Sequence, residues 1–314
     1  MNLLPLTFAV SHSDRRSRGC NTRRSAESLL TVIPAAGLSL SFVTASTASF
    51  GTTRDGLTQR RRHWAVSRPK AAILLVHGIG EHSGRYEHVG NALSDASFDV
   101  LSFDQRGFGE TAGRRAFVVD FSEYTDDVAD LLAERRKLGV PVVLMGHSLG
   151  GLVVATYLVG ANPLPDFAVL SAPALAAEIP RWQRAAVPVL GRVMPRLHVK
   201  SDFNGSVLSR DEAVQQAYDD DPLRVNGATA SLGREIMTTM TSTSEQINRI
   251  SVPAYVLHGG DDALVAPAAS EPIGQLDNVT RKVWPGLRHE SMNEPEWPEV
   301  VEGISTWLDA QLSG

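Results

Sequence analysis

Cysteine is almost absent from this chain, and a single cysteine, Cys20, excludes an internal disulfide and any zinc or iron–sulfur site built from several thiolates. Long apolar runs are also missing. No stretch reaches the roughly 18 residues of a membrane-spanning helix, so we do not expect an integral membrane protein. Hydrophobic residues make up 43% and charged residues 21% of the 314 residues. This ordinary globular composition excludes a wholly disordered chain, a collagen-like rod and a coiled coil.

Basic residues are scarce outside the first part of the chain. Residues 1–70 hold 11 basic and 3 acidic side chains, whereas the remainder holds 19 basic and 32 acidic ones. A body this acidic lacks the clustered cations that phosphate contacts need. Nucleic acid is therefore not expected among its partners.

The basic leader has a pattern of its own. Residues 11–25 are rich in Arg and Ser, and an apolar, small-residue stretch broken by Pro34 and Gly37 follows them. This order loosely resembles an export or transit segment. The apolar part is weak, however, and the Arg-rich part lies far from Met1. We expect residues 1–45 to be a disordered extension, with a signal segment as the alternative. The expected location is cytoplasmic or peripherally membrane-associated, with export as the alternative.

Short apolar runs alternate with helical patterns in the rest of the chain. The first run, AAILLVHG, is continuous and ends in glycine, as a strand buried in a parallel sheet should. Such alternation predicts an α/β fold, in which helices cover both faces of a mostly parallel sheet. The chemistry of such sheets lies beyond the carboxyl ends of the strands. Strands are predicted at 71–78, 98–104, 140–146, 167–173, 252–260 and 281–284, and helices at 86–97, 122–138, 149–160 and 297–312.

The alternation stops between about residues 174 and 246. This stretch contains helical pieces and several prolines, and no strand-like run interrupts it. We interpret it as a helical cap over the site, because long insertions in enzymes are often lids. The alternative is an insertion that has only a structural role. The folded domain is then expected to span residues 46–314, as one domain with this insertion.

A candidate nucleophile lies in residues 146–150, GHSLG, which match G-x-S-x-G. This motif needs a sharp turn from strand to helix that strains the serine backbone, and small neighbours that avoid clashes. Here it joins a predicted strand to a predicted helix. That context favours Ser148 as a nucleophile over a structural Gly-Ser turn.

A serine hydroxyl needs a base, and the motif predicts the order Ser, acid, His along the chain. Of the nine histidines, only His289 lies after the last candidate acid strand, in a loop where a base is expected. His77, His147 and His258 adjoin strand ends too. A packing role or a polar loop role is the simpler interpretation of each.

Two adjacent acids, Asp261 and Asp262, follow the predicted strand 252–260. Neighbouring side chains point in different directions, and the residues alone do not choose between them. The other one would form a turn or cap a helix.

The oxyanion of an acyl-transfer intermediate needs two N–H donors. One is expected from Leu149, directly after the nucleophile, and the other from Ile79, in the loop after the first strand. Backbone donors need no particular side chain, so both assignments rest on position.

A longer pattern resembles a known family. The run HGIGEHSGRYEHVGNAL (77–93) resembles the HGxGEHSGRY signature of monoacylglycerol lipases and their lysophospholipase-like bacterial relatives, S33-type hydrolases of the α/β-hydrolase fold. The match continues through FDQRGFGE, GHSLGG, LSRDEAVQQAYDDDPL, HGGDDALV and the His289 loop, over roughly residues 50–312. G-x-S-x-G alone would specify only a superfamily. HGxGEHSGRY together with YxxDPL is far more specific.

The resemblance implies hydrolysis of monoacylglycerol to glycerol and fatty acid through an acyl-enzyme, with Ser148, Asp262 and His289 as the triad. It selects Asp262 because the family's acid lies two residues before the Leu of a D-x-L pattern. It also implies the same two oxyanion donors and neither metal nor organic cofactor. Thr111 is one departure, where relatives commonly carry Ser. The resemblance further suggests that four residues lie near the alcohol pocket, although the first two would equally form a structural ion pair: Glu81, Arg85, His147 and Tyr218.

A lipid ester is thus the expected partner, and the oligomeric state stays open. The main alternative is a broad carboxylesterase, lysophospholipase or thioesterase with the same triad. An aminopeptidase of the same fold and a catalytically dead binding module are others. A haloalkane dehalogenase or epoxide hydrolase would carry Asp at position 148, and Ser148 excludes both. Apolar cap residues are expected either to hold the acyl chain and touch lipid, or only to pack the cap: Val187, Val189, Leu190 and Met194.

Overall fold

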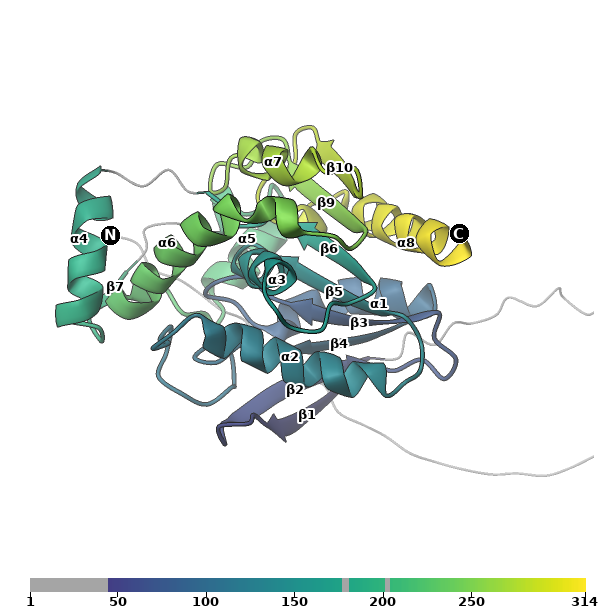
Figure 1. The fold of residues 1–314 in the computed structure, drawn as a ribbon, viewed down its shortest axis with the longest axis horizontal. Coiled ribbons are helices and arrows are strands. Elements are labelled where there is room, and N and C mark those ends of the chain that lie inside the picture. The colour runs from purple at the N-terminus through teal and green to yellow at the C-terminus, as the bar shows by residue number, and fades with distance from the viewer. Residues whose placement is uncertain (1–44, 177–180, 201–203) are drawn as a thin grey trace, which may run out of the picture. The chain divides into compact units, whose positions relative to one another are not determined.

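The central element of the computed structural model is a sheet of eight strands (Figure 1). The structure describes residues 45–176, 181–200 and 204–314. The extension that the sequence predicts at residues 1–45 lies outside the described residues, except for residue 45. The strands are β1 (Thr47–Thr52), β2 (Thr58–Trp64), β3 (Ala71–Val76), β4 (Phe98–Phe103), β5 (Val142–His147), β6 (Phe167–Ser171), β9 (Ala254–Gly259) and β10 (Val279–Trp284).

Strand pairing is parallel from β4 to the far edge, in the order β1-β2-β4-β3-β5-β6-β9-β10. The predicted mostly parallel sheet is therefore confirmed. The exceptions are β1 and β2, which form an antiparallel hairpin on β4 and which the apolar patterns did not predict. Their residues include three Thr and three Arg and are largely exposed or half-buried, because β1 is an edge strand.

Helices cover both faces of the sheet. Along β3 the side chains alternate: Leu74 and Val76 pack in one core with α2 and α3, and Ile73 and Leu75 pack in the other with α1 and α8. A strand that is buried on both faces accounts for the continuous apolar run in its sequence. These helices are α1 (Glu87–Asp95), α2 (Ser122–Arg136), α3 (Leu149–Val159) and α8 (Trp297–Ser313).

The insertion between β6 and β9 is mainly helical, as predicted, but it also contains a short antiparallel ladder. Two residues of β7 pair with two of β8, and so short a ladder leaves no apolar run in the sequence. Helices α4 and α6 lie side by side (Figure 1), and a Cβ on Gly191 would approach the Arg234 Cβ to 2.7 Å. The elements are α4 (Arg181–Val193), β7 (His198–Val199), η2 (Gly205–Val207), α5 (Glu212–Asp219), β8 (Ala228–Thr229), α6 (Ala230–Glu245) and η3 (Ile247–Arg249).

Four short elements complete the described part of the chain. They are η1 (Ser83–Tyr86), η4 (Pro267–Ser270), α7 (Glu271–Gly274) and η5 (Ser291–Asn293). Among the described residues, no helix has both the length and the apolar character needed to cross a membrane.

Candidate active site

Ser148 lies in the turn between β5 and α3, with φ +53° and ψ −113°. A non-glycine residue with positive φ is strained, and such strain often marks a functional site. The flanking glycines allow the turn. A Cβ on Gly146 would lie 2.3 Å from the Gly150 carbonyl oxygen, and one on Gly150 would lie 2.2 Å from the Val76 oxygen. The strand–turn–helix context expected for the motif is present.

We expect Gly150→Ala to lower the free energy of unfolding by about 1–3 kcal/mol, because the new methyl group forces α3 away from β3. A matched control is Gly233→Ala in α6, where the nearest atom to a new Cβ is 3.5 Å away. There alanine should be neutral or stabilising by up to about 1 kcal/mol, since it favours helix. Urea unfolding measures both variants. Equal destabilisation of the two would contradict this account of the close contact.

Three buried side chains from separate loops meet at this turn. His289 Nε2 lies 2.9 Å from Ser148 Oγ, and His289 Nδ1 lies 2.7 Å from Asp262 Oδ2. Of the two acids that the residues left open, Asp262 is the one that contacts His289. The Asp261 side chain is exposed. The backbone N–H of Asp261 donates to the Leu287 carbonyl oxygen at 2.9 Å.

Asp262 is held as an anion. Burial raises the pKa of this carboxyl, but hydrogen bonds from His258 and His289 outweigh burial and keep the pKa well below its usual value. Its other oxygen, Oδ1, accepts from the N–H groups of Leu264 at 2.8 Å and Val265 at 2.9 Å. The carboxylate therefore faces the imidazole with its charge and its orientation fixed.

The two expected oxyanion donors are at this site. Ile79 and Leu149 both line the cavity at Ser148. Gly78 lets the loop approach: a Cβ there would lie 3.4 Å from the Ser148 Cβ and 2.8 Å from Glu81 Oε1. Behind this loop, buried His77 accepts a hydrogen bond from the Gln105 N–H at 2.9 Å through Nε2. His77 therefore packs in the core, as the sequence suggested, and it also holds the loop that carries Gly78 and Ile79.

Buried charges lie beside the triad. Arg85 Nη1 donates to Glu81 Oε2 at 2.8 Å and to Glu290 Oε1 at 2.6 Å, and Nη2 donates to Glu290 Oε2 at 2.7 Å. The ion pair considered for Glu81 and Arg85 is therefore present and includes a third member. Sequence reasoning missed Glu290, although it directly follows His289. Two carboxylates against one guanidinium leave an excess negative charge next to the nucleophile.

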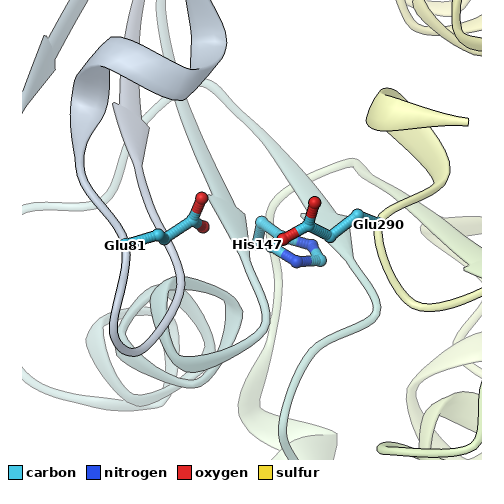
Figure 2. Close-up of side chains that lie close together, drawn as sticks. All are labelled: Glu81, His147 and Glu290. Atoms are coloured by element: carbon cyan, nitrogen blue, oxygen red, sulfur yellow. The ribbon is translucent and has the colours of Figure 1, made fainter. Parts of the chain in front are cut away.

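His147 completes this cluster. Figure 2 shows the side chains of Glu81, His147 and Glu290 pointing toward one another, and their ligand atoms all lie within 4.8 Å. Such a set offers ligands to a cation, but Arg85 already donates to both carboxylates and supplies the positive charge between them. Burial and the nearby His289 lower the pKa of His147 to about 4. Its ring is therefore neutral at pH 7, and its centroid lies 4.8 Å from that of His289.

Tyr218 from α5 brings the insertion to the same cluster. The guanidinium carbons of Arg85 and Arg224 lie 4.8 Å and 4.3 Å from the centroid of its ring. The Val225 N–H donates to the Gly80 oxygen at 2.9 Å, on the loop that carries Ile79. All four residues suggested for the alcohol side are thus brought together.

Glu290 links stability to pH. Burial raises its pKa, but the Arg85 guanidinium outweighs burial and lowers the pKa from 4.5 to about 2. The charged carboxylate therefore stabilises the fold above about pH 4.5, and this contribution is lost as the pH falls toward 2. We expect Glu290→Gln to lose less unfolding free energy than the wild type across this window. Urea titrations from pH 6 to pH 2 provide the comparison, and parallel curves would refute the expectation.

A cavity of about 190 Å³ opens onto the triad. Its polar lining includes Glu81, His147, Tyr218 and Glu290. Its apolar lining includes Leu208, Ile236 and Met240 from the insertion, and Leu264 and Val265 from the loop after β9.

The four apolar residues predicted to hold an acyl chain are not among those that line this cavity. Val189 is 58% exposed and Met194 is 51% exposed, whereas Val187 and Leu190 are half-buried. These four residues therefore form no part of the wall of this cavity. The reason is that α4 packs beside α6, and α6 rather than α4 supplies the side chains that reach the cavity.

Comparisons with known proteins agree with this geometry. A family model described as serine aminopeptidase, S33, matches residues 67–296. The monoacylglycerol lipase of Mycolicibacterium smegmatis is 32% identical over 254 residues, which cover 78% of this chain and 90% of that protein. Phospholipase YtpA of Bacillus subtilis is 30% identical over 258 residues, covering 79% and 99%. The crystal structure of Paleococcus ferrophilus monoacylglycerol lipase superposes with a TM-score of 0.74 at 30% identity, covering 81% of this chain and 99% of that one.

Proposed function

Because the chain belongs to the serine aminopeptidase S33 family and is a serine ester hydrolase of the α/β-hydrolase fold, as predicted, we propose that its substrate is a monoacylglycerol. The observation that carries this proposal is the cavity at Ser148, whose lining joins the polar cluster of Glu81, His147 and Glu290 to apolar side chains of α6. In this proposal the acyl chain of the ester lies against Ile236 and Met240. Its alcohol then lies toward Glu81 and Glu290.

The proposed reaction proceeds through an acyl-enzyme. His289 takes the Ser148 proton as Oγ bonds to the ester carbonyl carbon, and Asp262 stabilises the imidazolium. The N–H groups of Ile79 and Leu149 stabilise the oxyanion, an effect worth about 3–4 kcal/mol for each donor lost in a comparable site. The carbon–oxygen bond to glycerol then breaks, and His289 returns the proton to the leaving glycerol oxygen. Water, activated by His289, cleaves the acyl-enzyme to fatty acid and free Ser148.

The test is fatty-acid release from a long-chain monoacylglycerol, measured beside a diacylglycerol, a lysophospholipid and a short synthetic ester. We expect kcat/KM to be highest for the monoacylglycerol. Turnover of the short ester alone would leave a general esterase and would overturn the proposed substrate.

A phospholipase is the second candidate, because one relative carries that name. The cluster of Arg85 with Glu81 and Glu290 disfavours it, since its excess negative charge at the alcohol end repels a phosphate. A neutral head group with hydroxyl donors suits carboxylate acceptors better. In the same panel, a lysophospholipid that is turned over faster than the monoacylglycerol would favour this second candidate.

The insertion is proposed to act as a cap that also meets lipid. Val189, Val193 and Met194 are 58%, 67% and 51% exposed, and exposed Arg192 and Arg196 lie among them. Apolar side chains flanked by cations suit the surface of an anionic membrane. Sedimentation with vesicles that contain phosphatidylglycerol should retain the wild type, and Val193→Ser with Met194→Ser should weaken retention. Unchanged retention by the double variant would exclude this surface.

A further inference from the structure

A second histidine contacts the carboxylate that faces His289. His258, on β9, is completely buried. Its Nε2 lies 2.8 Å from the Val265 carbonyl oxygen and 3.3 Å from Asp262 Oδ2. Both oxygens only accept hydrogen bonds, so Nε2 carries a proton and donates to them. The sequence suggested only a packing or polar loop role for this histidine.

Residues behind His258 set its tautomer. Its Nδ1 lies 2.9 Å from Ser270 Oγ, and Arg281 Nε donates to the same oxygen at 3.0 Å. The Ser270 hydroxyl also donates to the Pro267 carbonyl oxygen at 3.0 Å, and Arg281 Nη2 donates to the same oxygen at 2.7 Å. Because His258 Nε2 carries the proton, Nδ1 can only accept, so its hydrogen bond with Ser270 forms when the hydroxyl proton turns from Pro267 to Nδ1. A line of hydrogen bonds thus connects Arg281 on β10, through η4 and β9, to Asp262.

We propose that His258 is a positioning residue for the reaction: its Nε2–H, with the tautomer set by Ser270 and Arg281, holds the Asp262 carboxylate against His289. This inference rests on the triad assigned under the proposed function. Both carboxylate oxygens depend on His258. It contacts Oδ2 directly, and it binds the carbonyl oxygen of Val265, the residue whose own N–H donates to Oδ1 at 2.9 Å.

Loss of this donor has a predictable electrostatic effect. The charged and titratable groups around Asp262 and His289 include His258 from β9, His147 at the end of β5 and Glu290 beside the base, together with Glu81 and Arg85 of the buried cluster. Without the His258 donor, more of the carboxylate charge is directed at His289, which then holds its proton more tightly. The acid limb of the kcat/KM profile should move to higher pH. The carboxylate is also less well oriented, so kcat should fall while KM stays constant.

The experiment compares two substitutions of His258. His258→Met fills the buried space without a donor, and His258→Gln keeps a donor amide. With p-nitrophenyl butyrate as substrate, we expect His258→Met to lower kcat about tenfold and to raise the acid limb by about half a pH unit. His258→Gln should restore most of kcat and return the limb to its position in the wild type.

A milder variant keeps the test informative if His258→Met fails to fold. Ser270→Ala removes only the group that sets the tautomer, and it should lower kcat a few-fold with the same shift of the acid limb. An unchanged kcat in the folded variants overturns the proposal, and so does a loss of kcat with an unmoved limb and no rescue by Gln.

Failure of the triad itself would look different. Wild-type protein that neither hydrolyses p-nitrophenyl butyrate nor reacts with a fluorophosphonate would overturn the proposed function, and the role of His258 with it. Active wild-type protein together with unaffected His258 variants overturns the role of His258 alone.

Discussion

Ser148→Ala is expected to fold as the wild type does and to lose ester hydrolysis by roughly 10⁵–10⁶-fold in kcat, the scale seen when a triad serine is removed. Folding should be unaffected because the backbone strain at this position, φ +53°, is the same for alanine as for serine. The oxyanion donors remain, so a small residual rate above that of water is also expected. Initial rates with the monoacylglycerol and with the short ester measure the loss.

A fluorophosphonate label provides the control for this variant. Wild-type protein should take up one label per chain, and Ser148→Ala should take up none, while thermal unfolding of the two proteins coincides. Retained turnover or retained labelling in Ser148→Ala would show that another residue is the nucleophile.

Asp262→Asn is expected to lower kcat by about 10⁴-fold with little change in KM. The neutral amide no longer stabilises the imidazolium, and its N–H₂ group can face His289 Nδ1 and force the wrong tautomer. The donors now arranged around the carboxylate from Leu264, Val265 and His258 would also lose an anionic acceptor. Saturation kinetics separate kcat from KM.

The neighbouring acid is the matched control. Asp261 has the same side chain one residue earlier, but that side chain is exposed. Asp261→Asn should therefore keep kcat within about twofold, because an exposed charge this far from the imidazole is screened by water. The opposite pattern, with Asp261→Asn severe and Asp262→Asn mild, would reassign the acid.

These two acids show where local reasoning from the residues ends. A strand end places both of them at the correct edge of the sheet, but the direction of each carboxylate depends on the loop that follows. That loop is held by the Leu264 and Val265 N–H groups on Asp262 Oδ1. Only the resemblance to a family with a D-x-L pattern predicted which of the two acids belongs to the triad. In the structure the predicted residue, Asp262, contacts His289.

The sequence by itself determined the features that arise from neighbouring residues. Burial on both faces produces the apolar run of β3, and a strained turn requires the glycines around Ser148, so both can be read from a few consecutive positions. The order of Ser148 and His289 along the chain was enough to expect them together at the strand ends.

Tertiary structure alone decided what depends on residues far apart in the chain. The polar hairpin of β1 and β2 exists because it pairs with β4, and no apolar pattern marks it. Glu290 joins the buried charge cluster through Arg85, 205 positions away. His258 acquires its contact with Asp262 from the loop that folds back over β9. The periodicity of apolar residues indicates which side of a helix or strand is buried. Which residues contact that side is decided only when the elements pack together.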